Sequence, residues 1–321
     1  MSANRRGSPV TAPGGSLRTF VPDVFRLTAR SLSPRDLVLL ALLTLFWGIN
    51  WPVMKFAVEA YPPLSFRLLS MIGGVAALWA VARVRGLPLA LPAGAWREVV
   101  RLSLPNMVGW HLFAIYGVKL LSSGRAAILG YTMPVWALVF GVAMFGDRVG
   151  ARMWIGVVAS ALAVILLLSG ELGALGGSPP GTLLMLIAAA SWGYGTHLLR
   201  RQTLGVPTLI LTFWMMVVTT LLIAPVAVVL EAAAWRWPGP GEWLAIAYNA
   251  LVVFGFCHVV WFHLARILPP VASGLSVMAI PVLGVFSGMI GLGEIPHWQD
   301  YAALALIALA LSTVLLRRQP A

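Results

Sequence analysis

Residues 122–148 read SSGRAAILGYTMPVWALVFGVAMFGDR, and a second copy of this pattern lies 147 positions further on, at residues 269–295. In the same ungapped register Pro134 recurs as Pro281. The other matched positions are Ala127 with Gly274, Gly141 with Gly288, Gly146 with Gly293, and the acidic Asp147 with the acidic Glu294. We interpret the chain as an internal duplication.

The composition is that of a membrane protein. Sixty per cent of the residues are hydrophobic, 10% are charged, and the mean hydropathy is +0.90, whereas soluble domains are roughly a quarter charged. The net charge of +12 does not indicate a nucleic-acid partner, because the charges lie between apolar runs and form no basic face. The single cysteine, Cys257, leaves no intrachain disulfide to form.

Ten long apolar runs are free of formal charge. Because backbone amides cannot stay unpaired in hydrocarbon, each run predicts a spanning helix of about 20 residues. The runs are residues 37–54, 68–82, 102–118, 126–146, 153–170, 181–199, 202–230, 243–265, 267–293 and 301–316. We therefore expect an all-α integral membrane protein with ten transmembrane helices and the lipid bilayer as its main partner.

The basic residues predict how the helices are oriented, since Lys and Arg are retained in cytoplasmic loops. With the N-terminus inside, 17 of the 22 basic residues are cytoplasmic, so both termini are expected there. The first 34 residues contain no apolar core of the length that a signal peptide needs. The expected parts are a flexible basic cytoplasmic tail (1–34), a first five-helix repeat (35–170) and a second one (180–317).

The duplication is also visible near the start of each half of the sequence. Trp47-Gly48 matches Trp192-Gly193, and Pro62 matches Pro207, at a spacing of 145. Each copy contains five predicted helices, and an odd number makes the second copy enter the bilayer from the opposite side. This pattern predicts the inverted repeats of secondary transporters.

These residues resemble a known family. Trp47-Gly48-Ile49-Asn50, the following Tyr61-Pro62-Pro63 and the two segments that end in Gly-Asp and Gly-Glu are similar to the EamA domain of the drug/metabolite transporter superfamily. Asp147 replaces the usual Glu, and Ile295 stands where the first copy has Arg148. The resemblance implies a ten-helix carrier in a bacterial inner membrane, with a central cavity and relatives that export metabolites, including aromatic amino acids.

Two histidines are related by the repeat, since His111 plus 147 gives His258, and both lie near the middle of their runs. A polar ring at that depth is costly in lipid and is expected to face protein or water. One interpretation is a pair that flanks the substrate path and offers hydrogen bonds or a titratable group. The other is a pair of helix-packing histidines bonded to backbone carbonyls.

Other polar side chains within the runs are neutral, namely Asn50, Asn106, Asn249 and His197. Neutral amides and imidazoles can bind a zwitterion without a fixed counter-ion. No Asp or Glu lies well inside any run, which argues against a carboxylate proton relay and a permanently cationic cargo. Uniport, exchange and histidine-based proton coupling all remain compatible with the sequence.

Aromatic and thioether side chains that lie deep in the runs could line a roomy pocket for bulky or planar apolar groups. Core packing is the alternative role for each of them. Together with the polar side chains they form the candidate substrate-binding set: Trp47, Asn50, Asn106, Trp110, His111, Tyr131, Trp192, His197, Asn249, His258, Trp261 and Met278.

Pro134 and Pro281 each remove a backbone hydrogen bond, so the helices that carry them are expected to bend and to serve as candidate hinges. Lys55 and Arg67 stand close to predicted helix ends. We expect them to snorkel to the interface; attraction of a carboxylate is the alternative.

The sequence therefore predicts a secondary transporter that exports small metabolites, above all amino acids with bulky apolar or aromatic side chains, by alternating access. One alternative is a carrier of the same superfamily for a drug, nucleotide sugar or lipid-linked substrate. Another is an integral membrane enzyme, although the chain has no His-Glu-x-x-His, nucleophile elbow, phosphate-binding loop or paired intramembrane carboxylates. We expect no catalytic residue, cofactor or bound metal, and no particular oligomeric state is predicted.

Overall fold

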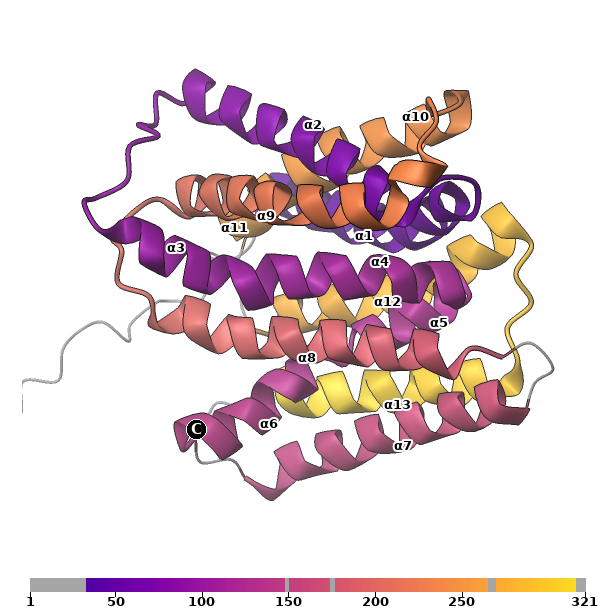
Figure 1. Ribbon diagram of the computed structural model, residues 1–321. Helices are drawn as coiled ribbons and strands as arrows, with labels where there is room; N and C mark the ends of the chain where they lie inside the picture. The colour runs from indigo at the N-terminus through magenta and orange to yellow at the C-terminus, as the bar shows by residue number, and fades with distance from the viewer. Residues whose placement is uncertain (1–32, 148–149, 174–176, 265–269, 316–321) are drawn as a thin grey trace, which may run out of the picture. The chain divides into compact units, whose positions relative to one another are not determined.

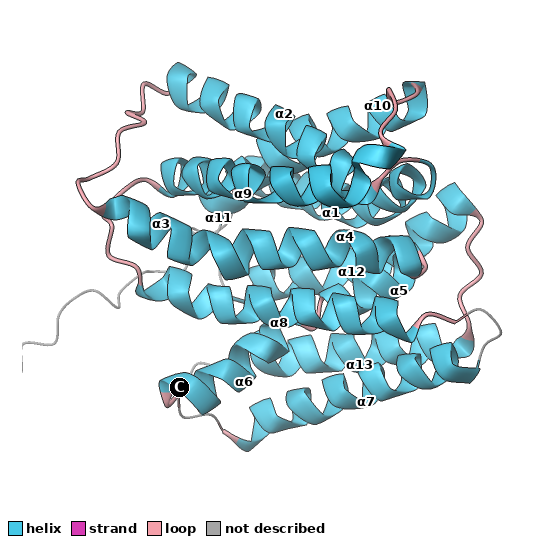
Figure 2. Ribbon diagram, viewed as in Figure 1, coloured by secondary structure: helices cyan, strands magenta, loops and turns pink. Residues whose placement is uncertain are grey.

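The computed structural model describes residues 33–147, 150–173, 177–264 and 270–315, and every regular element among them is helical (Figure 2). The elements of the first half are α1 (Pro34–Ala60), α2 (Pro63–Val84), α3 (Ala95–Ser103), η2 (Leu104–Gly109), α4 (Trp110–Leu120), α5 (Ser123–Gly130), α6 (Met133–Phe145) and α7 (Ala151–Gly173). Those of the second half are α8 (Pro179–Arg201), α9 (Thr208–Glu231), η3 (Ala232–Ala234), α10 (Pro240–Ala247), η4 (Tyr248–Cys257), α11 (His258–Leu264), α12 (Pro270–Leu292) and α13 (Trp298–Leu315).

Seven helical segments of the described chain are long and apolar enough to cross a membrane. They are Pro34–Ala60, Pro63–Val84, Ser123–Phe145, Ala151–Gly170, Pro179–Arg201, Thr208–Ala234 and Pro240–Trp261. Each of the ten predicted apolar runs overlaps a helix. The prediction of an all-α membrane protein is confirmed.

Helices of the two halves pack against one another along their lengths, and their connections lie at two opposite ends (Figure 1). The main pairs are α1 with α12, α2 with α9, α4 with α8, and α7 with α13. The core between them contains fully buried side chains such as Phe66 on α2, Ile115 on α4 and Phe254 on η4. Within a membrane such side chains stabilise the helix bundle through van der Waals packing, because lipid tails are as apolar as the protein interior.

Two glycine contacts show the duplication in the packing. A Cβ atom on Gly48 of α1 would collide with Leu283 of α12, and one on Gly193 of α8 would lie 2.8 Å from Cβ of Trp136 on α6. The sequence offsets that relate the two copies carry Gly48 to Gly193 and Trp136 to Leu283. The same close contact between halves therefore occurs twice, once with each half supplying the glycine.

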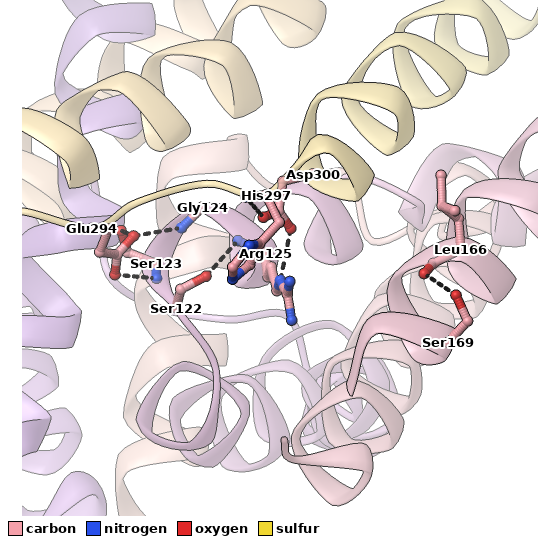
Figure 3. Close-up of polar contacts among 9 residues, drawn as sticks. All are labelled: Ser122, Ser123, Gly124, Arg125, Leu166, Ser169, Glu294, His297 and Asp300. Carbon is pink, nitrogen blue, oxygen red and sulfur yellow. Dashed lines mark hydrogen bonds and ion pairs between the residues drawn. The ribbon is translucent and has the colours of Figure 1, made fainter. Parts of the chain in front are cut away.

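At the end of the helix bundle where α2 and α5 begin, carboxylates from the other half cap both helices, and we call it the capped end. Glu231, at the end of α9, accepts hydrogen bonds from the amides of Leu64 and Ser65 at 2.9 and 2.8 Å. Glu294, after α12, accepts them from the amides of Ser123 and Gly124 at 2.6 and 3.3 Å (Figure 3). Both carboxylates satisfy free amides in the first turn of a helix and complement its dipole.

A buried ion pair lies beside the second cap. Nε of Arg125 on α5 is 2.6 Å from a carboxylate oxygen of Asp300 on α13, and both side chains are largely buried (Figure 3). A second oxygen of Asp300 accepts a hydrogen bond from the amide of His297. The capped end thus joins α5 to the connection between α12 and α13 through charged and polar contacts.

The two candidate hinge prolines have different surroundings. At Pro134 the helix is interrupted, since α5 ends at Gly130 and α6 begins at Met133. Pro281 lies within α12, which continues through it. The helix is thus interrupted just before Pro134 and continuous through Pro281, and the hinge role of both prolines stays a prediction.

The contact of Gly193 predicts a difference between two glycine substitutions. A methyl group in Gly193→Ala would lie 2.7 Å from the backbone nitrogen of Ala137, so α6 and α8 must separate. We expect a loss of about 1–3 kcal/mol and a lower melting temperature of the purified protein. Gly291→Ala, on α12 with nothing within 4 Å of the added Cβ, serves as the control and should cost no stability. Equal melting temperatures of the two variants would contradict this packing.

Candidate functional site

A π-helical segment precedes each of the two repeat-related histidines. In the first half η2 ends at Gly109, and His111 is the second residue of α4. In the second half η4 ends at Cys257, and His258 is the first residue of α11. The two halves therefore share a π-helical segment at corresponding positions. Such segments widen the helical turn and often occur at functional sites.

The ring of Phe254, on η4, brings three of the polar side chains together. Its centroid is 5.6 Å from those of His111 and of His258. Cζ of Arg67, on α2, lies 5.9 Å from the same centroid. Two imidazoles and a guanidinium therefore border one buried aromatic ring.

Tryptophans extend this site along α1 and α11. The ring of Trp47 lies edge-on to His258 at 6.1 Å and 5.7 Å from Trp261. Asn50 follows Trp47 by three residues, and Met54 follows Asn50 by four, so the three share one face of α1. That face leads from the indoles to Arg67, whose Nη2 is 3.0 Å from Sδ of Met54.

Several buried polar atoms here have no hydrogen-bond partner among the described residues. They are Oδ1 of Asn50, Nε of Arg67, both ring nitrogens of His111 and Oδ1 of Asn249. Their helices, α1, α2, α4 and η4, contact one another. An unpaired buried polar group costs about 1–3 kcal/mol. We call these four residues the unpaired cluster; the remaining unpaired atom, Oγ1 of Thr182, lies on α8.

Arg67 departs from the expectation that it reaches the interface. It lies in the second turn of α2 and only 3% of it is exposed, so the prediction of snorkelling was wrong for this residue. Its position beside an apolar run was visible in the sequence, but the direction in which its side chain points depends on packing against α1 and η4.

Two other candidates have partners within the protein. Nδ2 of Asn106 donates to the carbonyls of Leu102 and Gly195, both at 3.0 Å. His197 hydrogen-bonds the carbonyl of Ala137 and stacks on Phe145 at 4.9 Å. These contacts hold α8 against η2 and α6.

The other aromatic candidates form pairs near the same helices. Trp110 and Trp192 meet edge-to-face at 5.5 Å, between α4 and α8. Tyr131 lies 6.4 Å from Trp51 on α1. Met278 belongs to α12, but its side chain lies outside the described part of the structure.

A cavity of about 410 Å³ opens at the capped end, lined in part by Tyr61, Tyr116, Lys119, Glu231 and Arg236. The hydroxyl of Tyr116 donates to Glu231 at 2.9 Å. Burial raises the pKa of Tyr61, in the turn before α2, so its hydroxyl stays protonated. Sequence reasoning missed this cavity because Glu231 follows a long apolar run without any sign of its distant partners.

No group of three or more His, Cys, Asp or Glu side chains that could hold a metal ion occurs in the described ranges. The site instead combines polar atoms with aromatic walls inside an apolar helix bundle. This arrangement can bind a small molecule that has a polar head and an apolar body.

The long apolar helices define a multi-pass membrane protein. The chain belongs to the EamA-like transporter family, which it matches twice, over residues 36–169 and 179–316. It is therefore a transporter-family protein of the bilayer.

Individual relatives are distant but cover most of the chain. The uncharacterized transporter YoaV of Bacillus subtilis is 24% identical over 78% of this chain and 86% of its own length. The uncharacterized inner membrane transporter YedA of Escherichia coli is 28% identical over 85% and 88%, and the aromatic amino acid exporter YddG of Ancylobacter novellus is 25% identical over 84% and 94%. One crystal structure shares the fold with a TM-score of 0.62 at 22% identity, over 88% of this chain and 96% of that one.

The unpaired ring of His111 predicts an unusual response to mutation. His111→Leu removes a buried polar group that has no partner, so we expect the melting temperature of the ligand-free protein to rise. His197→Leu is the matched control, because it removes a carbonyl hydrogen bond and a ring stack and should lower the melting temperature. A loss of stability in both variants would assign His111 to packing.

Proposed function

We propose that this transporter exports amino acids with bulky apolar or aromatic side chains by alternating access, without ATP. The observation that supports it is the unpaired cluster, in which His111 and Arg67 border Phe254. Trp47 precedes Asn50 of this cluster on one face of α1 and packs against Trp261. A zwitterionic head group would supply hydrogen bonds to the unpaired polar atoms, and the indole and phenyl rings would surround an apolar side group.

The relatives support the same cargo. YddG of Ancylobacter novellus is named an aromatic amino acid exporter, and a relative in Salmonella typhimurium that is 25% identical over 51% of this chain and 53% of its own length is named a probable amino-acid metabolite efflux pump. These names also favour transport over the alternative of an integral membrane enzyme.

We propose further that the chain crosses the membrane ten times, as two inverted five-helix repeats at residues 35–170 and 180–317. Two continuous runs of elements support this count, because α3, η2 and α4 follow one another without a gap, as do α10, η4 and α11, and each run can form one crossing. The two family matches and the repeated glycine contact between halves support the duplication.

Alternating access requires the two ends to open in turn. The hydrogen bonds of Glu231 and Glu294 fasten the two halves together at the capped end, so we expect them to break when the halves separate there. The interruption at Pro134 gives α5 and α6 freedom to move relative to each other, and we propose Pro134 as a hinge. Pro281 would contribute by weakening α12 at the corresponding position.

We propose an inner-membrane location with both termini in the cytoplasm, which reporter fusions can test. Green fluorescent protein joined after Ala321 should fluoresce, and alkaline phosphatase at the same position should be inactive. After five crossings the chain lies on the outer side of the inner membrane, so phosphatase joined after Gly177 should be active. Phosphatase activity at both positions would contradict the inverted repeat.

Transport can be measured with the purified protein in liposomes, using labelled tryptophan, phenylalanine, leucine and glycine, with and without a proton gradient. We expect faster movement of the three bulky amino acids than of glycine. His111→Ala and His258→Ala should each lower the initial rate about tenfold, since each loses a polar contact in the site.

The control for these variants is His297→Ala, because His297 is exposed in the connection before α13 and should leave the rate unchanged. Movement of a nucleotide sugar or a drug, with no movement of any amino acid, would contradict the proposed cargo. The EamA family assignment would stand in that case.

A further inference from the structure

Arg67 is a buried cation without a counter-ion. Within the described residues no carboxylate pairs with it: its contacts are the thioether of Met54 and the ring faces of Phe66 and Phe254, each ring centroid 5.9 Å from Cζ. A guanidinium has five N–H donors and stays charged in proteins, whereas a thioether is a weak acceptor. Most of the donors of Arg67 therefore lack a suitable acceptor.

The nearest acids at the same end of the helix bundle are already engaged. Glu231 accepts hydrogen bonds from Leu64, Ser65 and Tyr116, two of which belong to the turn that precedes Arg67. Glu242 pairs with Arg236 and Asp300 pairs with Arg125. Among the described residues no acid thus remains to pair with Arg67, and we infer that a ligand supplies the anion.

The other unpaired atoms have the opposite hydrogen-bonding character. Oδ1 of Asn50 and Oδ1 of Asn249 are buried acceptors without a donor. Asn50 lies one helical turn before Met54 on α1, so the two side chains share a face of that helix. Asn249 lies five residues before Phe254, which is one turn of the π-helical segment η4. Both asparagines therefore neighbour, along their helices, a residue that contacts Arg67. The site therefore offers a donor fork for an anion and amide oxygens for a cation.

We propose that Arg67 binds the carboxylate of the cargo, while the amide oxygens of Asn50 and Asn249 accept hydrogen bonds from its ammonium group. A planar guanidinium matches a carboxylate with two parallel hydrogen bonds. The apolar body of the ligand then lies against Phe254 and the indoles of Trp47 and Trp261. This assignment rests on the proposed transport of amino acids and makes the carboxylate a requirement for recognition.

The assignment can be tested with four ligands that share one indole ring: tryptophan, tryptophanamide, tryptamine and indole-3-propionate. Binding to the full-length protein in detergent is measured from the shift in melting temperature as the ligand concentration rises. We expect tryptophan and indole-3-propionate to bind the wild-type protein more tightly than the two ligands that lack a carboxylate.

Arg67→Gln should weaken binding of the two carboxylates about tenfold or more and leave tryptamine binding unchanged. Arg67→Lys keeps the charge without the planar fork and should give an intermediate affinity. Asn249→Leu should weaken tryptamine and tryptophan but not indole-3-propionate. The control is Arg83→Gln, since Arg83 is an exposed arginine at the other end of α2 and should change nothing.

Two outcomes would overturn the assignment: a wild-type protein that does not prefer carboxylates, or an Arg67→Gln variant that binds all four ligands as the wild type does or weakens them equally. Preference for a phosphate ester over each carboxylate would also overturn it. If the wild-type protein moves tryptophan in liposomes and one of these results is found, the proposed function stands and the assignment of Arg67 fails. If carboxylates bind through Arg67 but no amino acid is moved, the anion site stands and the proposed cargo fails.

Discussion

A polar atom buried among apolar helices needs a hydrogen-bond partner, and this constraint divides the buried polar side chains into two kinds. Glu231, Glu294 and Asn106 have all found donors or carbonyls on other helices, and they fasten those helices together. Arg67 and His111 have not. The first kind explains how the helices are held together. The second kind lies where we propose that a ligand supplies the missing hydrogen-bond partners.

The duplication explains why the site lies between the halves. Corresponding glycines bring α1 against α12 and α8 against α6, so each half packs against the other through one repeated contact. Corresponding π segments precede His111 and His258. The histidine that follows each π segment lies against Phe254, so this cluster combines residues from both copies.

The fold could be predicted from the sequence because hydropathy and the unpaired-amide constraint in lipid act locally, run by run. The relation between His111 and His258 was also visible in the sequence, since the repeat pairs them, and both rings lie beside Phe254. The orientation of Arg67 was not, because it depends on Met54 and on Phe254, almost 190 residues away. The partners of Glu231 were equally hidden, since Ser65 lies in a different half of the chain.

Two repeat-related carboxylates at opposite ends of the helix bundle make unequal contacts among the described residues. Glu294 reaches the amides of α5, whereas the shorter Asp147, its counterpart, is 45% exposed and lies 3.7 Å from Arg201 and 3.9 Å from His197. Short, partly buried bonds outlast long solvated ones. When empty, a carrier that rocks between these ends would favour the conformation in which the Glu294 side is closed and the opposite side is open to cargo. The concentration gradient of the cargo would still decide the direction of net transport. The resting conformation would decide from which side of the membrane the empty carrier first binds cargo.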